Sequence, residues 1–143
     1  MQELITCDFK QDMFFEADVD GHKIGMDASD EFGGKNKGPR PKPLILAALS
    51  GCSGMDVVSL LNKMHVSFSG LRIYVEGNLT DTAPKHYDHI NVIYEISGKD
   101  LPKEEVEKAV RLSQEKYCGV IASLKQSAEV IYEIKYVEVE QGG

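Results

Sequence analysis

Alternating apolar and polar positions mark the beginning of the chain. Residues 13–20 alternate roughly, the step Asp20-Gly21 suits a hairpin turn, and residues 22–27 continue as a second extended segment. Residues 3–10 are a further candidate strand. The pattern therefore predicts a small sheet at the start of the chain.

A loop and a long helix are predicted next. Residues 29–43 are rich in glycine and proline, which interrupt regular structure, and they are basic within an acidic chain. Residues 44–64 then run mostly apolar and small, and Pro43 suits a first helical turn because its missing N–H has no partner there. A helix that is apolar on nearly all sides is buried on most of them. Gly51 and Gly54 each cost such a helix about 1 kcal/mol relative to alanine, which indicates close backbone approach or access to Cys52.

The rest of the chain mixes strands and helices without regular alternation. The pattern predicts strands at residues 71–77, 90–96 and 130–139, a helix that begins near Pro102 and carries an apolar stripe over residues 101–117, and a shorter helix over residues 120–126. Gly119 interrupts the two helices, so Cys118 lies at their junction. This order favours an α+β fold with a largely antiparallel sheet over a doubly wound fold. The sequence has no internal repeat, and one domain over residues 1–143 is expected.

Composition excludes several classes of partner. The 143 residues carry a formal net charge of −7, which argues against a nucleic-acid or anionic-membrane surface. The first residues lack the basic and apolar regions of a signal peptide, and no uninterrupted apolar run reaches the ~18 residues of a membrane span. Three cysteines form an odd set, which favours reduced thiols in a cytoplasmic protein over a disulfide scaffold.

Thiols are the main candidate chemistry. Cys52 and Cys118 each lie in a small-residue helical stretch, where a free cysteine commonly serves as a small buried hydrophobe. If the two sulfurs meet in the fold, one would react with an oxidant and the other would resolve the sulfenic acid as a disulfide. A helix N-terminus at Cys118 would favour its thiolate. Cys7, on a predicted strand, is interpreted as structural.

Other kinds of site have weak support in the sequence. No phosphate loop, serine elbow or metal-ligand spacing is visible, so no cofactor and no metal are expected. His86 and His89 flank Tyr87-Asp88, and a role in a loop and at the start of a strand is favoured for both. The tyrosines of the predicted strands, Tyr94 among them, are interpreted as packing residues.

Two segments around the cysteines resemble the motifs of a known family. Residues 38–58 (GPRPKPLILAALSGCSGMDVV) are similar to the first cysteine motif of the OsmC/Ohr family, and residues 113–124 (SQEKYCGVIASL) to its second. The order of elements agrees over nearly the whole chain. The resemblance is closer to an OsmC-like subgroup than to the organic hydroperoxide resistance proteins proper.

The resemblance implies a fold and an activity. The fold would be an intertwined α+β homodimer in which antiparallel sheets wrap around central helices, with active sites at the subunit interface. The activity would be that of a thiol peroxidase that reduces organic hydroperoxides. By motif, Cys52 would be the peroxidatic and Cys118 the resolving cysteine. An external thiol or dithiol, such as a lipoyl group, would be the reductant.

The sequence departs from the better-characterised family pattern near the first motif. Those members have a glutamate after the proline segment and an arginine from an N-terminal loop, whereas this chain has Lys42 and Pro43 there and no arginine before Arg40. Arg40 is therefore the candidate cation that stabilises the thiolate, against the alternative of a solvated loop arginine. Asp56, one helical turn after Cys52, is the other charged residue of interest.

Two further interpretations remain open at this point. The chain would be a binding protein for a small hydrophobic ligand, or a redox sensor, on the same dimeric scaffold. In the other interpretation, the protein is a dimer whose cysteines only fill its core.

Overall fold

The chain consists of two compact units in the structure, a computed structural model that describes residues 1–140. The first unit is Met1–Ile45 and the second is Leu46–Gly143. Helix α1 (Pro41–Lys63) begins in the first unit and continues in the second. The prediction of one domain over residues 1–143 stays a prediction.

The first unit is a three-stranded antiparallel meander. Its strands are β1 (Thr6–Gln11), β2 (Phe14–Val19) and β3 (His22–Met26), in the order β1-β2-β3, and a short 3₁₀ turn, η1 (Asp30–Phe32), follows. Asp20 and Gly21 both have positive φ, at 52° and 81°, as a tight hairpin turn between twisted strands requires. The predicted hairpin is therefore confirmed.

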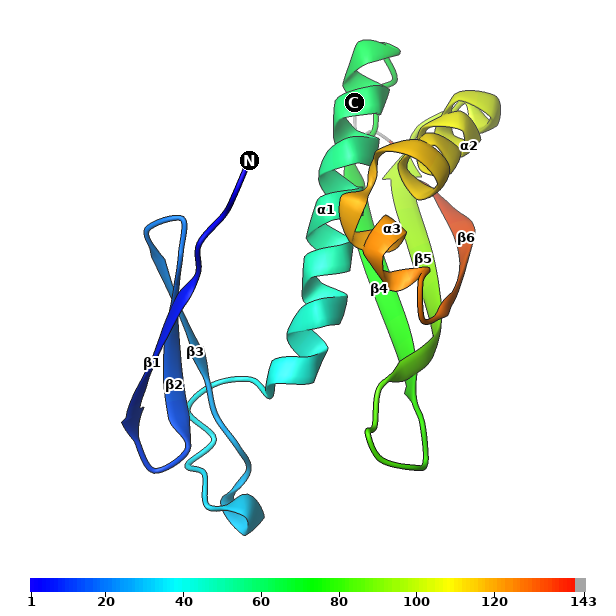
Figure 1. Cartoon of the computed structure of the whole chain (residues 1–143). Coiled ribbons are helices and arrows are strands. Elements are labelled where there is room, and N and C mark those ends of the chain that lie inside the picture. Colours follow the sequence, from blue (N-terminus) through cyan, green and yellow to red (C-terminus); the bar gives the residue numbers. More distant parts are fainter. Residues whose placement is uncertain (141–143) are drawn as a thin grey trace. The chain divides into compact units, whose positions relative to one another are not determined.

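The second unit combines a sheet with the helical segments α1, α2, η2 and α3 (Figure 1). Its elements after α1 are β4 (Gly70–Leu79), β5 (Tyr87–Gly98), α2 (Lys103–Leu112), the π-helical turn η2 (Ser113–Tyr117), α3 (Gly119–Leu124) and β6 (Glu129–Glu138). Helix α1 begins at Pro41, earlier than predicted, because prolines fit a first turn where the N–H groups have no intrahelical partner. Pro102 lies at the N-cap of α2 rather than inside its first turn.

The sheet of the second unit differs in one respect from the expectation. Strand β4 pairs antiparallel with β5, but β5 pairs parallel with β6, so this sheet is mixed rather than largely antiparallel. The chain between β5 and β6 crosses over through α2, η2 and α3, and a crossover of this length returns the chain in the same direction. The sequence pattern predicts the helices of this crossover but not the parallel direction of β6.

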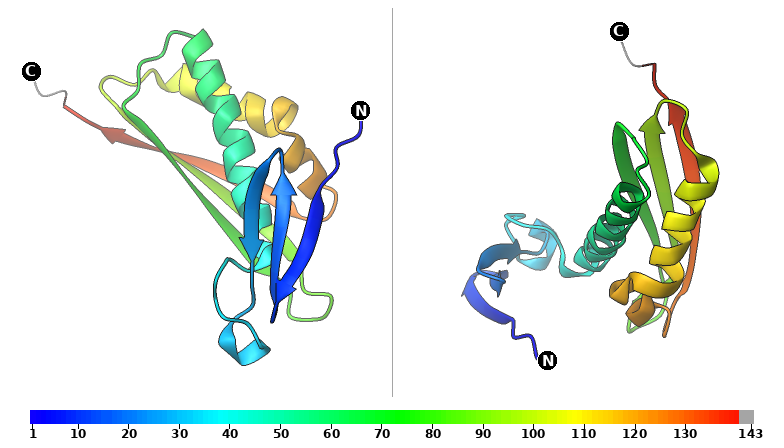
Figure 2. Two further views of the ribbon diagram at one scale, coloured as in Figure 1. Left: turned by 90° about the vertical axis from the view of Figure 1, so that its left-hand side faces the viewer. Right: turned by 90° about the horizontal axis from the view of Figure 1, so that it is seen from above.

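All three α-helices contribute to one core beside this sheet (Figure 2). One face of β5 supplies Ile90, Val92, Tyr94 and Ile96, all buried, and these pack with buried residues of the helices. The buried helical residues are Leu49, Val57 and Leu61 of α1, Val106, Ala109 and Val110 of α2, and Ile121 of α3. The predicted apolar stripe over residues 101–117 is confirmed at Val106, Ala109, Val110 and Ser113, but Tyr117 at its end lies in η2 and is 50% exposed.

Helix α1 is less buried than its composition predicts. It is long and apolar enough to cross a membrane by length and composition, yet core helices of water-soluble proteins share these properties. Met55 is 76% exposed, and an apolar groove of about 620 Å³ runs beside it between α1 and β4. The expectation that no membrane is a partner stays a prediction.

Candidate dithiol site

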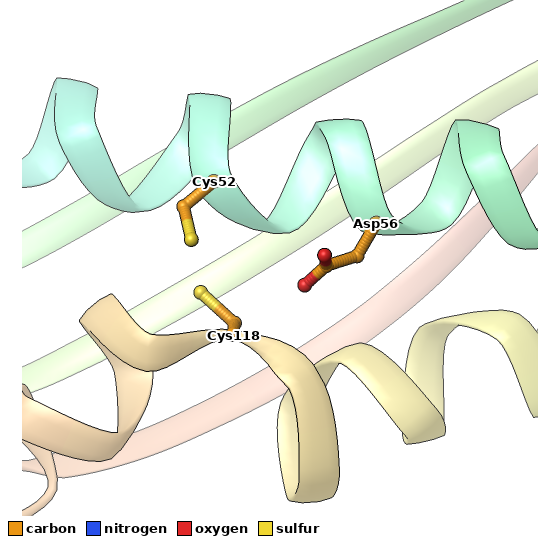
Figure 3. Close-up of side chains that lie close together, drawn as sticks. All are labelled: Cys52, Asp56 and Cys118. Atoms are coloured by element: carbon orange, nitrogen blue, oxygen red, sulfur yellow. The ribbon is translucent and has the colours of Figure 1, made fainter.

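Two thiols and a carboxylate meet between α1 and the start of α3. The Sγ atoms of Cys52 and Cys118 and a carboxylate oxygen of Asp56 all lie within 4.8 Å of one another. Figure 3 shows the two cysteine side chains pointing toward each other, with the Asp56 carboxylate beside them. All three cysteines of the chain are in the reduced form. The structure thus brings together the two cysteines that the sequence singled out, although 65 residues separate them along the chain.

Local backbone geometry explains both placements. Cys52 and Asp56 are four residues apart on α1, so their side chains share one face of the helix. Cys118 has extended backbone angles (φ −77°, ψ 105°) between η2 and α3, and its sulfur accepts a hydrogen bond from the Ile121 amide at 3.5 Å. The predicted helix junction at Cys118 is therefore confirmed.

The two thiols differ in environment. Cys118 is only 4% exposed, and burial raises the pKa of its thiol to about 11, with a further rise from neighbouring Cys52. It is therefore protonated at neutral pH, in contrast to the thiolate expected from a helix N-terminus. Cys52 is half-buried and so more accessible to a reagent in solution.

A chain of buried hydroxyl groups ends on the Asp56 carboxylate. Ser113 Oγ lies 3.1 Å from Asp56 Oδ2 and 2.7 Å from Ser53 Oγ, and Ser53 in turn contacts the hydroxyl of Tyr94. Gln114 Nε2 donates to that tyrosine hydroxyl at 2.8 Å. Because Gln114 Nε2 and the carboxylate fix the two ends, each hydroxyl donates once toward Asp56: Tyr94 to Ser53, Ser53 to Ser113, and Ser113 to Asp56.

Sequence reasoning missed this network. Tyr94 was interpreted as packing, yet its hydroxyl is a buried donor, and burial raises its pKa so that it stays protonated. The available signal was two serines, Ser53 and Ser113, at positions of apolar helical faces, where a hydroxyl needs a partner. Those partners come from distant elements and were not visible in the sequence.

Arg40 belongs to a loop of the first unit. Its guanidinium donates to the backbone oxygens of Asp27 and Gly38, at 3.3 and 3.0 Å, and to Asn36 Oδ1 at 2.7 Å. The Asp27 carboxylate is buried there and accepts the amides of Ala28, Lys35 and Lys37. Arg40 therefore has a structural role in this loop, and its predicted catalytic role stays a prediction.

The remaining candidates lie outside the dithiol site. Cys7 is exposed on β1. His86 precedes β5 and His89 lies near its start, as expected, and His89 contacts Asp88 and Glu129. Lys42 falls in the first turn of α1.

Known proteins are similar to this chain, whose mixed α+β fold holds two facing thiols. The sequence matches the OsmC-like protein family over residues 34–133, and the chain belongs to this family. It is 32% identical to Protein YhfA of Escherichia coli K12 over 124 residues, which are 87% of this chain and 90% of that protein. The resemblance stated from the two cysteine motifs is thereby confirmed.

Solved structures agree with the family assignment. A hypothetical protein from Aquifex aeolicus VF5 superposes with a TM-score of 0.80 at 28% identity, covering 95% of this chain and 98% of that one. The organic hydroperoxide resistance protein OhrB of Bacillus subtilis gives a TM-score of 0.66 at 15% identity, covering 94% and 98%, a likeness of fold alone. The α+β OsmC-like fold is therefore established for this chain.

Proposed function

We propose that the protein is a cysteine-based thiol peroxidase that reduces organic hydroperoxides. The observation that carries this proposal is the approach of the Cys52 and Cys118 sulfurs to within 4.8 Å, with one thiol accessible and the other buried. A peroxidatic cysteine must meet the substrate, while a resolving cysteine needs only to reach the oxidised partner. Membership of a family that includes hydroperoxide resistance proteins supports the same assignment.

The proposed cycle has three balanced steps. The Cys52 sulfur attacks the hydroperoxide ROOH, the O–O bond breaks, and a sulfenic acid and the alcohol ROH form. Cys118 then condenses with the sulfenic acid to give a disulfide and water, and its protonated thiol supplies the proton for the leaving hydroxide. An external thiol or dithiol reduces the disulfide and restores both thiols, so no cofactor is required.

Stabilisation of the Cys52 thiolate is the demanding part of this proposal. A cation beside the sulfur would stabilise the attacking thiolate, whereas the charged group of the cluster is the Asp56 carboxylate. Arg40 is the proposed cation, and it would have to leave its three acceptors in the loop to reach the sulfur.

The direct test is turnover of cumene hydroperoxide with dithiothreitol or a lipoylated donor. Wild-type protein should consume the hydroperoxide, and Cys52→Ser should lose nearly all of this activity. Cys118→Ser should react once and then stall as a sulfenic acid, because its resolving thiol is gone. Cys7→Ser is the matched control and should behave as wild type. Equal turnover by wild type and Cys52→Ser would reject the peroxidase.

A non-enzymatic role is the second candidate. The apolar groove beside Met55 has the character of a site for a small hydrophobic ligand, and the charged group beside Cys52 is a carboxylate rather than the cation typical of reactive cysteines. A redox sensor or a ligand-binding protein fits these two observations. Native mass spectrometry of the purified protein separates this role from the first: a co-purified ligand together with thiols that do not react with hydroperoxide would favour binding.

A homodimer in the cytoplasm is the proposed form of the protein. Its support is the exposed apolar surface along α1, together with the exposed aromatic pair Phe9 and Phe15 of the first unit. Size-exclusion chromatography with light scattering should give twice the 15.8 kDa of one chain. A monomeric mass at micromolar concentration would reject the dimer.

A further inference from the structure

The dithiol site has the donor set of a metal centre. Two thiol sulfurs and a carboxylate oxygen lie within 4.8 Å of one another, and each comes from a different residue. A tetrahedral zinc ion with ordinary bond lengths would hold its sulfur ligands ~3.8 Å apart. Small side-chain rotations therefore suffice to place one cation between Cys52, Asp56 and Cys118.

The carboxylate of Asp56 gives the dithiol site a negative charge that a bound cation would neutralise. The Asp56 carboxylate forms no ion pair with any lysine, arginine or histidine among residues 1–140. Two thiol sulfurs lie beside this carboxylate, within 4.8 Å of its oxygen. A bound dication would stabilise the carboxylate and both sulfurs together as its ligands.

Hydrogen bonds from neighbouring residues orient two of the three proposed ligands. The Ser113 hydroxyl fixes the Asp56 carboxylate by a hydrogen bond at 3.1 Å, and the Ile121 amide donates to the Cys118 sulfur. Such outer hydrogen bonds orient metal ligands. Asp56 also lines a surface hollow of about 290 Å³ together with Ser59, Leu60, Lys63 and Tyr117.

We propose that the reduced protein binds one thiophilic divalent cation of the Zn²⁺ class through Cys52 Sγ, Cys118 Sγ and a carboxylate oxygen of Asp56. A fourth position would take water or another small ligand. On binding, two S–H bonds break, two sulfur–metal bonds form, and two protons pass to solvent without any transfer of electrons.

This site would compete with thiol oxidation. The same two sulfurs cannot hold a cation and form a disulfide at once, so a bound cation would protect the thiols and an oxidant would release the cation. The metal site rests on its own geometry and does not require the proposed peroxidase activity. The two proposals therefore fail or succeed in separate experiments.

The test uses cadmium as a spectroscopic probe for the zinc class. Full-length Cys7→Ser protein, reduced with a phosphine and freed of metal, is titrated with Cd²⁺ without oxygen. A thiolate-to-cadmium charge-transfer absorption should rise and saturate at one equivalent, and Zn²⁺ should displace it. Prior oxidation of the same protein with diamide should abolish the absorption. This control tests the role of the two thiols without a substitution at Cys52, Cys118 or Asp56.

Variants then assign the ligands. Cys52→Ser and Cys118→Ser should each lose the saturable absorption, and Asp56→Asn and Ser113→Ala should each weaken binding by about tenfold or more. Glu115→Gln, an exposed carboxylate close to Cys118 in sequence, is the matched control and should bind as tightly as the parent. Circular dichroism confirms that each variant is folded. Absence of saturable absorption in the parent, or equal affinity in Asp56→Asn, would overturn the proposal.

Discussion

Two aspartates, one in each unit, show how the same side chain serves different purposes. Asp27 is 3% exposed, and its carboxylate accepts the backbone amides of Ala28, Lys35 and Lys37, with Arg40 nearby. Asp56 is half-buried, accepts one hydroxyl from Ser113, and faces two thiols. The first carboxylate is saturated by its own loop, whereas the second retains acceptor capacity toward a reactive site.

The two aspartates therefore differ in role: Asp27 stabilises a loop, and Asp56 lies at the candidate functional site. The spacing of Asp56 from Cys52 marks it in the sequence, whereas nothing in the sequence marks Asp27. A carboxylate whose oxygens are occupied by backbone donors stabilises a loop. A carboxylate with free acceptor capacity beside two thiols is instead available to bind a cation.

The largest effect on stability is expected at Asp27. Hydrogen bonds, first that from the Lys37 amide, lower its pKa in the folded protein, so its stabilising contribution is complete above the ordinary aspartate value near 3.9 and is lost as the pH falls through the lowered value. Asp27→Asn should therefore lower the thermal unfolding temperature at pH 7, and its difference from wild type should shrink toward pH 3. Asp56→Asn should have a much smaller effect at pH 7, and equal losses from the two variants would break the comparison.

The next effect is expected at Tyr94, which stands at the buried end of the chain of hydroxyls that reaches Asp56. Tyr94→Phe leaves the Ser53 hydroxyl and the Gln114 amide without their partner, at a cost of about 1–3 kcal/mol. Urea unfolding measures this loss in the free energy of unfolding. Tyr132→Phe, on a more exposed ring that packs edge-on against Tyr94, is the control and should cost under about 0.5 kcal/mol. Equal costs would mean that the hydroxyl chain contributes nothing to stability.

The smallest effect concerns thiol reactivity. Asp56→Asn removes a negative charge within 4.8 Å of the Cys52 sulfur, and this charge repels an anionic reagent, so alkylation by iodoacetate should become about fivefold faster at pH 7. Asp27→Asn should leave this rate unchanged. Mass-spectrometric quantification of Cys52 labelling over time measures both. A slower reaction in Asp56→Asn would indicate that the carboxylate activates the thiol, and the roles assigned to the two aspartates would need revision.

Local features of the fold were predictable because they depend on neighbours in sequence. The hairpin at Asp20-Gly21 requires positive φ at both residues, and the helical run breaks near the predicted glycine, at Cys118, while Gly119 itself is the first residue of α3. The parallel pairing of β5 with β6 was missed, since strand direction depends on where the crossover helices pack. The same limit applies to the early start of α1, because prolines permit a first turn without marking which residue begins it.

The site was predictable in part. Motif resemblance identified Cys52 and Cys118, and the structure confirms that their sulfurs approach each other. The carboxylate of Asp56 joins them for a local reason, its spacing of four residues from Cys52. The hydroxyl chain through Tyr94 and Ser113 could not be predicted, because it depends on contacts among α1, β5 and η2 that no spacing along the chain encodes.

The central claim is that Cys52 and Cys118 form one redox pair, and peptide mapping tests it most directly. Reduced wild-type protein is treated with one equivalent of cumene hydroperoxide, the remaining thiols are blocked, and the protein is digested without reductant for mass spectrometry. The account predicts a peptide pair linked by a Cys52–Cys118 disulfide, with Cys7 recovered as a blocked thiol. Recovery of Cys52 as a sulfinic acid beside a blocked Cys118, or of all three cysteines as blocked thiols, would contradict it.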